Sequence, residues 1–315
     1  MIQVNNLKKY FTARKSGFFE KHGIIKALNG VSFSIPEGAT LGLVGESGSG
    51  KTTAARSILR LIEPDAGSVT VDGTDILALS RQEMRKFRKN MQIVFQDPYS
   101  SLDPRMTIGK IISEPLRVHT KLSKAEIHER LLELINMVGL SKEHADRYPH
   151  EFSGGQRQRV GIARAISLNP KFIILDEPVS ALDVSIQGQI LNLLKDLQRT
   201  INLTYLFVAH DLAVVKHMSD RIAVMYLGSI VEENSVENLY KKPLHPYTVS
   251  LLSSIPQPGL GKRGFTVLKG EIPSPENPPQ GCLFHPRCAR AMDICKYDPP
   301  VMKNSEDGSV ACHLF

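Results

Sequence analysis

Several features are missing from this sequence, and each absence narrows the function. No apolar run approaches the roughly 18–20 residues that a membrane-spanning helix requires. Residues 1–6 carry neither a basic group nor the apolar stretch that follows one in a signal peptide. We therefore expect a chain that stays in the cytoplasm unless another protein holds it at a membrane. Its hydrophobic share of 42% and charged share of 23% are those of a soluble globular protein.

An arginine-rich arm with interleaved aromatic residues is also missing. The net charge is +7 and the isoelectric point is about 9.2, a balance that can favour nucleic acid or anionic lipid. The charges are spread through helical segments of mixed sign, however, as is typical of solvated helix faces. We therefore expect no direct nucleic-acid partner.

Cysteine is absent from the first 281 residues, and all four cysteines follow: Cys282, Cys288, Cys295 and Cys312. A cytosolic chain has little use for structural disulfides. A cluster of this kind instead indicates metal or iron–sulfur ligation.

Buried-strand and helical patterns alternate along most of the chain and predict an α/β fold with a parallel sheet and an antiparallel β arm. The expected strands are 2–10, 27–35, 39–44, 67–73, 91–95, 172–175, 204–208, 222–227 and 229–232, and the expected helices include 53–61, 126–137, 184–198 and 212–218. Residues 97–168 are mainly helical in pattern and are expected to form a subdomain. Six prolines and four glycines between 256 and 279 predict a boundary near Ile255, which separates domain 1–255 from a tail, 256–315.

A phosphate-binding loop is predicted at residues 45–52, which fit G-x-x-x-x-G-K-[ST] between a strand and a helix. Glycines let successive N–H groups face a phosphate, and the helix adds its positive end. Lys51 would reach the β- and γ-phosphates of ATP, and Thr52 would offer its hydroxyl to Mg²⁺. An ordinary glycine-rich turn is the weaker alternative. The predicted nucleotide contacts are Gly45, Ser47, Gly48, Ser49, Gly50, Lys51, Thr52 and Thr53.

Two carboxylates follow the apolar run 172–175 and are expected at the carboxyl end of a buried strand, where open α/β sheets bind ligands. Asp176 is suited to hold magnesium through water, and Glu177 is suited to polarise the attacking water. A strand that ends in solvated acids is a common alternative, but the phosphate loop makes it the weaker one here.

The run Ser153-Gly154-Gly155-Gln156 lies about 20 residues before the acidic strand end. With this motif the sequence resembles the ATP-binding cassette (ABC) family over residues 1 to about 250. The resemblance implies a P-loop NTPase fold with a RecA-like parallel core. It also implies roles for residues at matching positions: Gln96 contacts magnesium and water, Asp183 couples two ATP sites, His210 contacts the γ-phosphate, and Tyr10 lies under the adenine.

The start of a helix at Ser153, Gly154 and Gly155 is suited to bind an anion. The resemblance implies that this turn faces the γ-phosphate held by a second ATPase subunit, identical or related. Two residue assignments have plain alternatives. Phe11 could stack on adenine in place of Tyr10, and His210 could be an ordinary surface or core histidine.

Residues 96–106, residues 245–248 and the cysteine-bearing tail resemble the peptide-permease branch of the family. This implies an ATPase that powers dipeptide or oligopeptide import, peripheral on the cytoplasmic face of the inner membrane. The implied partners are two transmembrane permease subunits, one of which inserts a short helix into a groove at 97–117, and indirectly an extracytoplasmic peptide-binding protein. The alternatives are a related importer of nickel or other peptides and a soluble ABC ATPase. A non-hydrolysing subunit is disfavoured by Glu177.

The cysteines are spaced C-x5-C-x6-C-x16-C, which differs from the paired C-x2-C of structural zinc sites. Four thiolates suit a [4Fe–4S] cluster, and the permease resemblance implies the same. Zinc on the same thiolates and free cysteines in an unstructured tail remain as alternatives. His285 and His313 lie close in sequence but are interpreted as bystanders.

Overall fold

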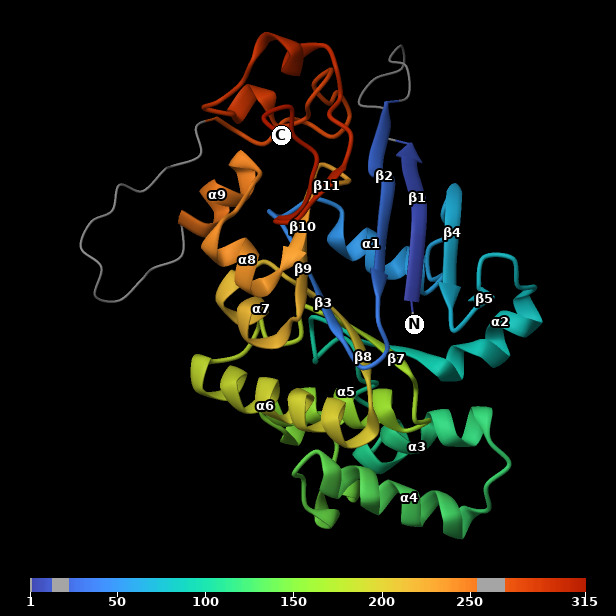
Figure 1. Ribbon diagram of the computed structural model, residues 1–315. Coiled ribbons are helices and arrows are strands. Elements are labelled where there is room, and N and C mark those ends of the chain that lie inside the picture. Colours follow the sequence, from blue (N-terminus) through green and yellow to red (C-terminus); the bar gives the residue numbers. More distant parts are fainter. Residues whose placement is uncertain (1, 13–22, 254–269) are drawn as a thin grey trace, which may run out of the picture. The chain divides into compact units, whose positions relative to one another are not determined.

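The computed structural model describes residues 2–12, 23–253 and 270–315 (Figure 1). The chain divides into two compact units. The first unit consists of Ile35–Thr40 and Ala78–Val208, and the second consists of Ile2–Ser34, Leu41–Leu77 and the described part of Ala209–Phe315. The boundary expected near Ile255 lies outside the described residues.

The first unit is built on parallel strands in the order β6–β7–β8. These are β6 (Met91–Val94), β7 (Phe172–Asp176) and β8 (Thr204–Ala209). Ile174 of β7 pairs with Ile93 on one side and Leu206 on the other. Every residue of β7 and β8 is buried, which explains their nearly continuous apolar runs. The predicted parallel sheet is therefore confirmed.

The helices of the first unit include three that lie in the range where a helical subdomain is expected. Helix α4 begins two residues before its predicted start, because Ser123 and Glu126 form a capping box there. Helix α3 packs against both α4 and α5. The helical segments are α2 (Arg81–Phe87), η1 (Arg88–Asn90), α3 (Ile108–His119), α4 (Lys124–Met137), η2 (Lys142–Asp146), η3 (Pro149–Glu151), α5 (Gly154–Ile166) and α6 (Val184–Ile201).

The second unit contains the antiparallel arm, with strand order β2–β1–β4–β5. Its strands are β1 (Ile2–Thr12), β2 (Ile24–Ile35), β4 (Ala66–Val71) and β5 (Thr74–Asp75). Ile2 pairs with Val71, and Ile2, Val4 and Leu7 are buried on one face. The alternation of buried and exposed residues along β1 shifts between Asn5 and Lys8, because the pairing of β1 with β4 is irregular there.

A mixed sheet forms the rest of this unit, in the order β11–β12–β10–β9–β3. Only β3 and β9 are parallel among these pairs. The strands are β3 (Thr40–Val44), β9 (Arg221–Tyr226), β10 (Ser229–Ser235), β11 (Lys303–Ser305) and β12 (Gly308–Val310). Because β12 hydrogen-bonds to β10, the end of the tail belongs to the same sheet as β3, the strand that precedes the phosphate loop.

The helical segments of the second unit are α1 (Lys51–Ile58), α7 (Leu212–Met218), α8 (Val236–Lys241), α9 (Pro246–Ser253), η4 (His285–Arg287) and η5 (Asp293–Lys296). Helix α1 starts and ends earlier than the predicted 53–61. It begins directly after Gly50, its N-cap, and ends before Arg60, whose φ of 48° is incompatible with a continued helix. Among the described residues no helix is long and apolar enough to cross a membrane.

Candidate active site

The phosphate loop connects β3 to α1 and requires glycine at both of its ends. Gly45 has a φ of 155°, and a Cβ at this position would lie 2.2 Å from the carbonyl oxygen of Met225. Gly50 has a φ of 104°, and its Cβ would lie 2.4 Å from the carbonyl oxygen of Ala27. Since both obstacles are backbone atoms, no side chain can be accommodated by a change of rotamer. The loop is therefore set by close backbone packing in the second unit.

Lys51 lies over the loop that precedes it and is 6% exposed. Its Nζ donates to the carbonyl oxygens of Gly45 at 2.7 Å and Glu46 at 2.9 Å, and lies 3.5 Å from the hydroxyl of Ser49. Ser47 and Gly48 are exposed at the outer part of the loop, whereas Thr52 and Thr53 are half-buried in the first turn of α1. A cationic amine and the start of a helix thus occupy the same loop, an arrangement suited to bind phosphate.

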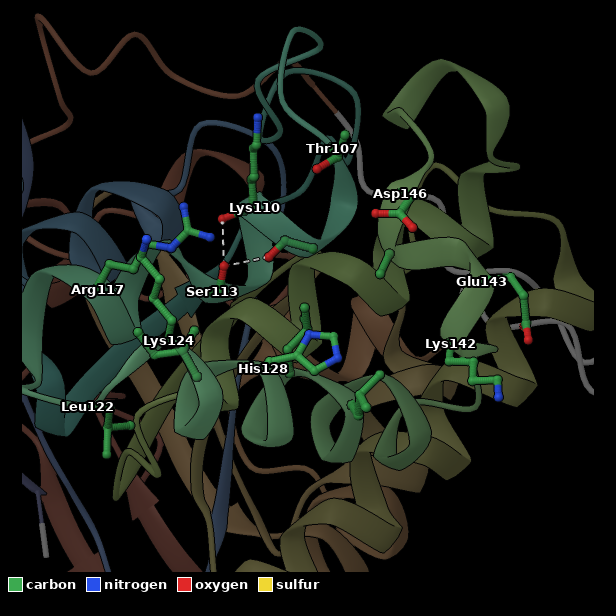
Figure 2. A pocket seen from close by; sticks show the side chains of 15 residues that line it. Thr107, Lys110, Ser113, Arg117, Leu122, Lys124, His128, Lys142, Glu143 and Asp146 are labelled. Carbon is green, nitrogen blue, oxygen red and sulfur yellow. Dashed lines mark hydrogen bonds between the residues drawn. The ribbon is translucent and has the colours of Figure 1, made fainter.

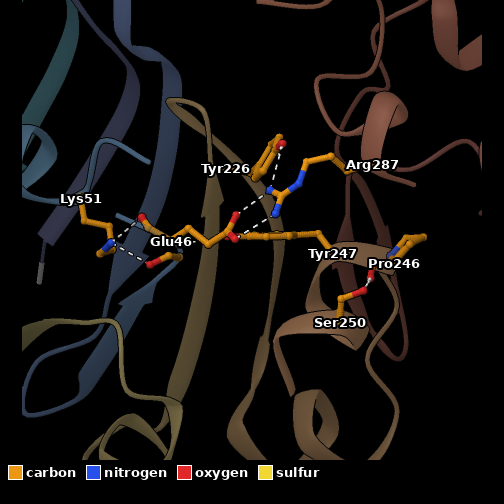
Figure 3. A network of polar contacts seen from close by, with 8 residues as sticks. Glu46, Lys51, Tyr226, Pro246, Tyr247, Ser250 and Arg287 are labelled. Atoms are coloured by element: carbon orange, nitrogen blue, oxygen red, sulfur yellow. Dashed lines mark hydrogen bonds and ion pairs between the residues drawn. The ribbon is translucent and has the colours of Figure 1, made fainter. Parts of the chain in front are cut away.

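Glu46, the second residue of the loop, has partners that the sequence analysis missed (Figure 3). Its N–H donates to the hydroxyl of Tyr247 at 2.9 Å. Its carboxylate accepts two hydrogen bonds from Arg287, with Nη1–Oε2 at 2.7 Å and Nη2–Oε1 at 3.0 Å. No motif marks this contact in the sequence. The sequence offers two weak indications: Arg287 directly precedes Cys288, and Tyr247 belongs to the run 245–248 that resembles the peptide-permease branch.

The acidic strand end lies in the first unit and includes one strained residue. Asp176 closes β7 and is 2% exposed. Glu177 has a φ of 47°, a left-handed conformation that costs a non-glycine residue free energy. Its N–H donates to the carbonyl of Val208 at 2.9 Å, and its carboxylate accepts from Gln96 Nε2 at 2.7 Å. Two residues predicted to act on the same water therefore lie in direct contact.

The signature turn, residues 153–156, starts helix α5 with a capping box. The hydroxyl of Ser153 accepts from the N–H of Gln156 at 3.3 Å, and the side chain of Gln156 accepts from the N–H of Ser153 at 3.0 Å. A Cβ on Gly155 would lie 2.4 Å from Ile186 Cγ2, and one on Gly154 would lie 3.2 Å from Leu182 Cδ2. The turn therefore packs closely against the start of α6, whose N-cap is the predicted coupling residue Asp183.

Three further predicted residues have exposed or half-buried positions. Tyr10 is half-buried at the end of β1, where its hydroxyl lies 3.3 Å from Asn29 Oδ1. The ring of Phe11 is 37% exposed, with the Lys9 ammonium 5.5 Å from its centre. Both rings are accessible, so the choice between them for adenine stays open. His210 is exposed just after β8, before Asp211 caps α7.

A cavity of about 910 Å³ opens among α3, α4 and η2 in the first unit (Figure 2). Lys110 and Arg117 of α3, Lys124 of α4 and Lys142 of η2 give its lining a cationic excess over Glu143 and Asp146. The lining also includes the apolar residues Ile127 and Leu131. The lining thus extends beyond the groove predicted at 97–117, because α4 and η2 supply one of its sides.

The four cysteines lie within electrostatic reach of one another in the tail. Burial raises the pKa of Cys282, Cys288 and Cys312, and neighbouring cysteines raise each of these pKa values further. The Sγ of Cys288 accepts from the N–H of Arg290 at 3.4 Å. No disulfide joins them. In the part of the chain that the structure describes, no three His, Cys, Asp or Glu side chains are close enough to hold a metal ion, so the donor chemistry of the predicted cluster is present but its ligand geometry is not.

Two protein families match this chain. The ABC transporter family matches residues 28–180. The oligopeptide/dipeptide transporter C-terminal region matches residues 231–295. The two matches cover the phosphate loop, the acidic strand end, the signature turn and three of the four cysteines.

Curated relatives match along the whole chain. The oligopeptide transport ATP-binding protein AppF of Bacillus subtilis (strain 168) is 54% identical over 320 residues, which cover 100% of this chain and 97% of the relative. The probable peptide ABC transporter ATP-binding protein y4tS of Sinorhizobium fredii is 50% identical, with 100% of this chain and 90% of the relative covered.

Solved structures of ATP-binding cassettes share the fold. A dimeric post-hydrolysis state of the cassette MJ0796, bound to ADP and Pi, matches with a TM-score of 0.67 at 33% identity, over 75% of this chain and 99% of that one. The cbiO1 subunit of a Clostridium perfringens ABC transporter matches with a TM-score of 0.65 at 28% identity, over 76% of this chain and 90% of that one.

Proposed function

The chain belongs to the ABC transporter ATP-binding proteins, a family of ATP hydrolases, and from this premise we propose that it powers the import of dipeptides and oligopeptides. The observation that carries the proposal is the likeness to peptide-transport ATP-binding proteins along the whole chain, tail included. Closure of two ATPase subunits on ATP drives the membrane subunits, because ATP binds the closed state better. Hydrolysis then resets the pair.

Different residues bind the phosphates, activate the water and hold the metal ion. Lys51 and the loop N–H groups bind the β- and γ-phosphates, and His210 contacts the γ-phosphate. Glu177 polarises the water whose oxygen attacks phosphorus as the bond to the β-phosphate oxygen breaks. The hydrogen bond from Gln96 to Glu177 supports a shared role at that water. Thr52, Asp176 and Gln96 would hold Mg²⁺, which neutralises charge on the phosphates.

The complete site needs a second ATPase subunit, identical or related. Ser153 is the exposed N-cap of α5, and Gly154 and Gly155 are the first two residues of that helix. A helix start of this composition suits a γ-phosphate bound to the partner. Asp183 lies at the N-cap of α6, against which this turn packs, and it couples the two sites.

The cationic cavity among α3, α4 and η2 receives a short acidic helix from one of two transmembrane permease subunits. Its excess of lysine and arginine over carboxylates, and the apolar residues in its lining, are the features that support this partner. The chain is then peripheral at the cytoplasmic face of the membrane. An extracytoplasmic binding protein delivers the peptide.

The tail thiols hold a [4Fe–4S] cluster, with zinc on the same thiols as the alternative. The confinement of all four cysteines to residues 282–312 and the N–H donated to Cys288 Sγ support this assignment. Ligation requires thiolates and requires the four sulfurs to draw closer than in the structure. Iron, sulfide and zinc analysis of anaerobically prepared protein distinguishes the two, and stoichiometric zinc without sulfide would rule out the cluster.

The central test is the Glu177→Gln variant in proteoliposomes that contain the complete transporter. We expect ATP binding to persist, ATP hydrolysis to fall about 10²–10⁴-fold, and peptide uptake to stop. The exposed Glu129→Gln on α4 is the matched control and keeps full rates. Unchanged hydrolysis by Glu177→Gln would refute its role, and hydrolysis without any peptide uptake by the unaltered transporter would refute peptide import.

A further inference from the structure

One peptide unit at the start of the phosphate loop is held from both sides. The carbonyl oxygen of Gly45 accepts a hydrogen bond from Lys51 Nζ at 2.7 Å, and the N–H of Glu46 donates to the hydroxyl of Tyr247 at 2.9 Å. This C=O and this N–H belong to the same planar trans peptide and point in opposite directions. A rotation of the plane therefore displaces both contacts together. Figure 3 shows Glu46 between Lys51 and Tyr247.

The contact with Lys51 bears on phosphate binding because it orders the ammonium group in advance. A lysine side chain loses much rotamer freedom when it is fixed. The Nζ of Lys51 is already held by the carbonyl oxygens of Gly45 and Glu46, and the residue is 6% exposed. Part of the entropy that phosphate binding would remove is therefore lost before ATP arrives. Release of the Gly45 contact would transfer that loss to the binding step and weaken ATP binding.

A buried aromatic cluster keeps the hydroxyl of Tyr247 within reach of the loop. Tyr247 is 0% exposed. Its ring centre lies 4.7 Å from that of Tyr226 and 5.3 Å from that of Phe284. Because protein interiors are closely packed, the ring cannot swing away from the loop without displacing both neighbours. The position of the hydroxyl is thus set by packing within the second unit.

The backbone of Tyr247 is fixed by the residue that precedes α9. The N–H of Tyr247 donates to Nδ1 of His245 at 3.1 Å. Burial lowers the pKa of His245 to about 4, so the imidazole is neutral near pH 7 and its Nδ1 can accept. The run 245–248, for which the chemistry of ATP hydrolysis gives no role, therefore places one hydroxyl on the phosphate loop.

A buried carboxylate anchors this run to strand β10. Glu232 is 0% exposed, and its two oxygens accept from the N–H groups of Leu244 at 2.9 Å and His245 at 2.8 Å. Two hydrogen bonds to one carboxylate fix the direction of the chain as well as its position. Burial raises the pKa of Glu232, and the two N–H groups oppose that shift only in part. Printed contacts thus connect β10 to Lys51 through residues 244–247.

We propose that Tyr247 is a positioning residue for ATP binding. Its hydroxyl fixes the peptide between residues 45 and 46, and the carbonyl oxygen of that peptide holds Lys51 where it meets the β- and γ-phosphates. Glu232 acts one step further away, because it fixes the run that presents Tyr247. The role deepens the proposed function and rests on its assignment of ATP to residues 45–52.

The first experiment replaces Tyr247 with Phe, which removes the hydroxyl and keeps the ring. In the full chain, the affinity for a fluorescent ATP analogue should fall about tenfold, because the N–H of Glu46 loses its acceptor and the peptide that holds Lys51 is released. In the complete transporter the KM for ATP should rise by a similar factor, while kcat changes less than about twofold, since the lysine binds the phosphates before as well as during the reaction. Unchanged affinity in a folded Tyr247→Phe chain would overturn the proposal.

Tyr205→Phe is the matched control. Tyr205 is also 0% exposed, and its hydroxyl donates to the carbonyl of Leu194 at 3.0 Å within the first unit. This variant loses a buried hydrogen bond of the same kind, so urea denaturation should show a comparable loss of stability, while ATP affinity stays that of the unaltered chain. An equal loss of affinity in both variants would show that general destabilisation weakens ATP binding, and the role of Tyr247 would fall.

Hydrogen exchange at the amide of Glu46 reports the contact itself. In the unaltered chain this N–H is protected by the hydroxyl of Tyr247. In Tyr247→Phe it should exchange about tenfold faster or more, because local opening no longer breaks a hydrogen bond. An unchanged exchange rate at Glu46 would show that Tyr247 does not hold this peptide.

A second variant tests the same route with Tyr247 intact and guards against a failure of Tyr247→Phe to fold. Glu232→Gln replaces one acceptor oxygen by an amide NH₂, which cannot accept from the N–H of Leu244 or His245. We expect ATP affinity to fall about threefold, and no further fall when Glu232→Gln is added to Tyr247→Phe. A full additional loss in the Tyr247→Phe background would contradict a route through Tyr247.

Lys51→Met separates the positioning role from the ATP site on which it rests. We expect this variant to lose most of its ATP affinity. Full ATP binding by Lys51→Met would contradict the assignment of ATP to residues 45–52, whatever Tyr247 does. Weak binding by Lys51→Met together with full binding by Tyr247→Phe would keep that assignment and refute only the role of Tyr247.

Discussion

The phosphate loop and the signature turn each place glycines at the start of a helix, but their glycines meet different neighbours. In the loop, the missing Cβ atoms of Gly45 and Gly50 would collide with the backbone carbonyls of Met225 and Ala27. In the turn, those of Gly154 and Gly155 would meet the side-chain ends of Leu182 and Ile186. The loop glycines also have positive φ angles, whereas no such angle occurs at the two signature glycines.

These two glycines of the loop are thus required by neighbouring backbone atoms, whereas the two glycines of the turn are required by neighbouring side chains. A carbonyl of a neighbouring strand cannot move without breaking the sheet, whereas a side chain can be shortened by a second substitution. We therefore expect the effects of substituting Gly45 or Gly50 to be irreparable, and those of substituting Gly154 or Gly155 to be repairable by a second substitution. The two helix starts also differ in their N-caps. Gly50, the N-cap of α1, has no side chain to accept a hydrogen bond from the helix, whereas the hydroxyl of Ser153, the N-cap of α5, accepts one.

The largest effect is expected for Gly45→Ala. Its Cβ would lie 2.2 Å from Met225 O, so the variant should lose about 3 kcal/mol of unfolding free energy, the upper end of overpacking costs, and ATP binding with it. Urea denaturation and equilibrium binding measure both.

The matched control for Gly45→Ala lies in the same loop. A Cβ on Gly48 would meet nothing within 4 Å, so Gly48→Ala carries only the cost of its φ of 79°, about 1 kcal/mol. If the two variants lost equal stability, close backbone packing would not be what the loop requires of Gly45.

A smaller and repairable effect is expected for Gly155→Ala. Its Cβ would lie 2.4 Å from Ile186 Cγ2, which should cost about 2 kcal/mol and reduce hydrolysis by the assembled pair while ATP binding by the single chain persists. Ile186→Ala removes the clashing methyl, and the double variant should regain most of the lost stability. Gly161→Ala in the same helix, where a Cβ would meet nothing within 4 Å, serves as control. Failure of Ile186→Ala to restore stability would contradict the packing explanation.

The motifs with local spacing were predictable because their chemistry depends on neighbours in the chain. The phosphate loop lies between a strand and a helix as its glycine pattern predicts, and Asp176 ends a buried strand as the preceding apolar run predicts. A role for Gln96 at the attacking water was expected only from the resemblance to the family, and its contact with Glu177 was not predicted. Its hydrogen bond joins residues 81 positions apart, which no local pattern reports.

The tail was the least predictable region, because its contacts also join residues that are far apart in the sequence. Its prolines and glycines indicate loops, and short 3₁₀ segments are indeed found at 285–287 and 293–296. The pairing of β12 with β10 and the ion pair of Arg287 with Glu46 depend on partners more than 70 residues away. The cationic cavity itself was not predicted, because its lining combines residues of α3 with residues of α4 and η2 that are distant in the sequence.

The smallest effect is expected for Ser153→Ala, which separates the stability of a capped helix start from its function. Loss of the hydrogen bond to the N–H of Gln156 should cost about 1 kcal/mol of unfolding free energy. Ser123→Ala removes an equivalent capping box at α4 and should cost the same. Only Ser153→Ala should lower ATP hydrolysis by the assembled pair, because only this hydroxyl lies where a partner's γ-phosphate is proposed to bind. Equal hydrolysis rates for the two variants, measured at matched ATP saturation, would show that the hydroxyl of Ser153 serves the helix alone.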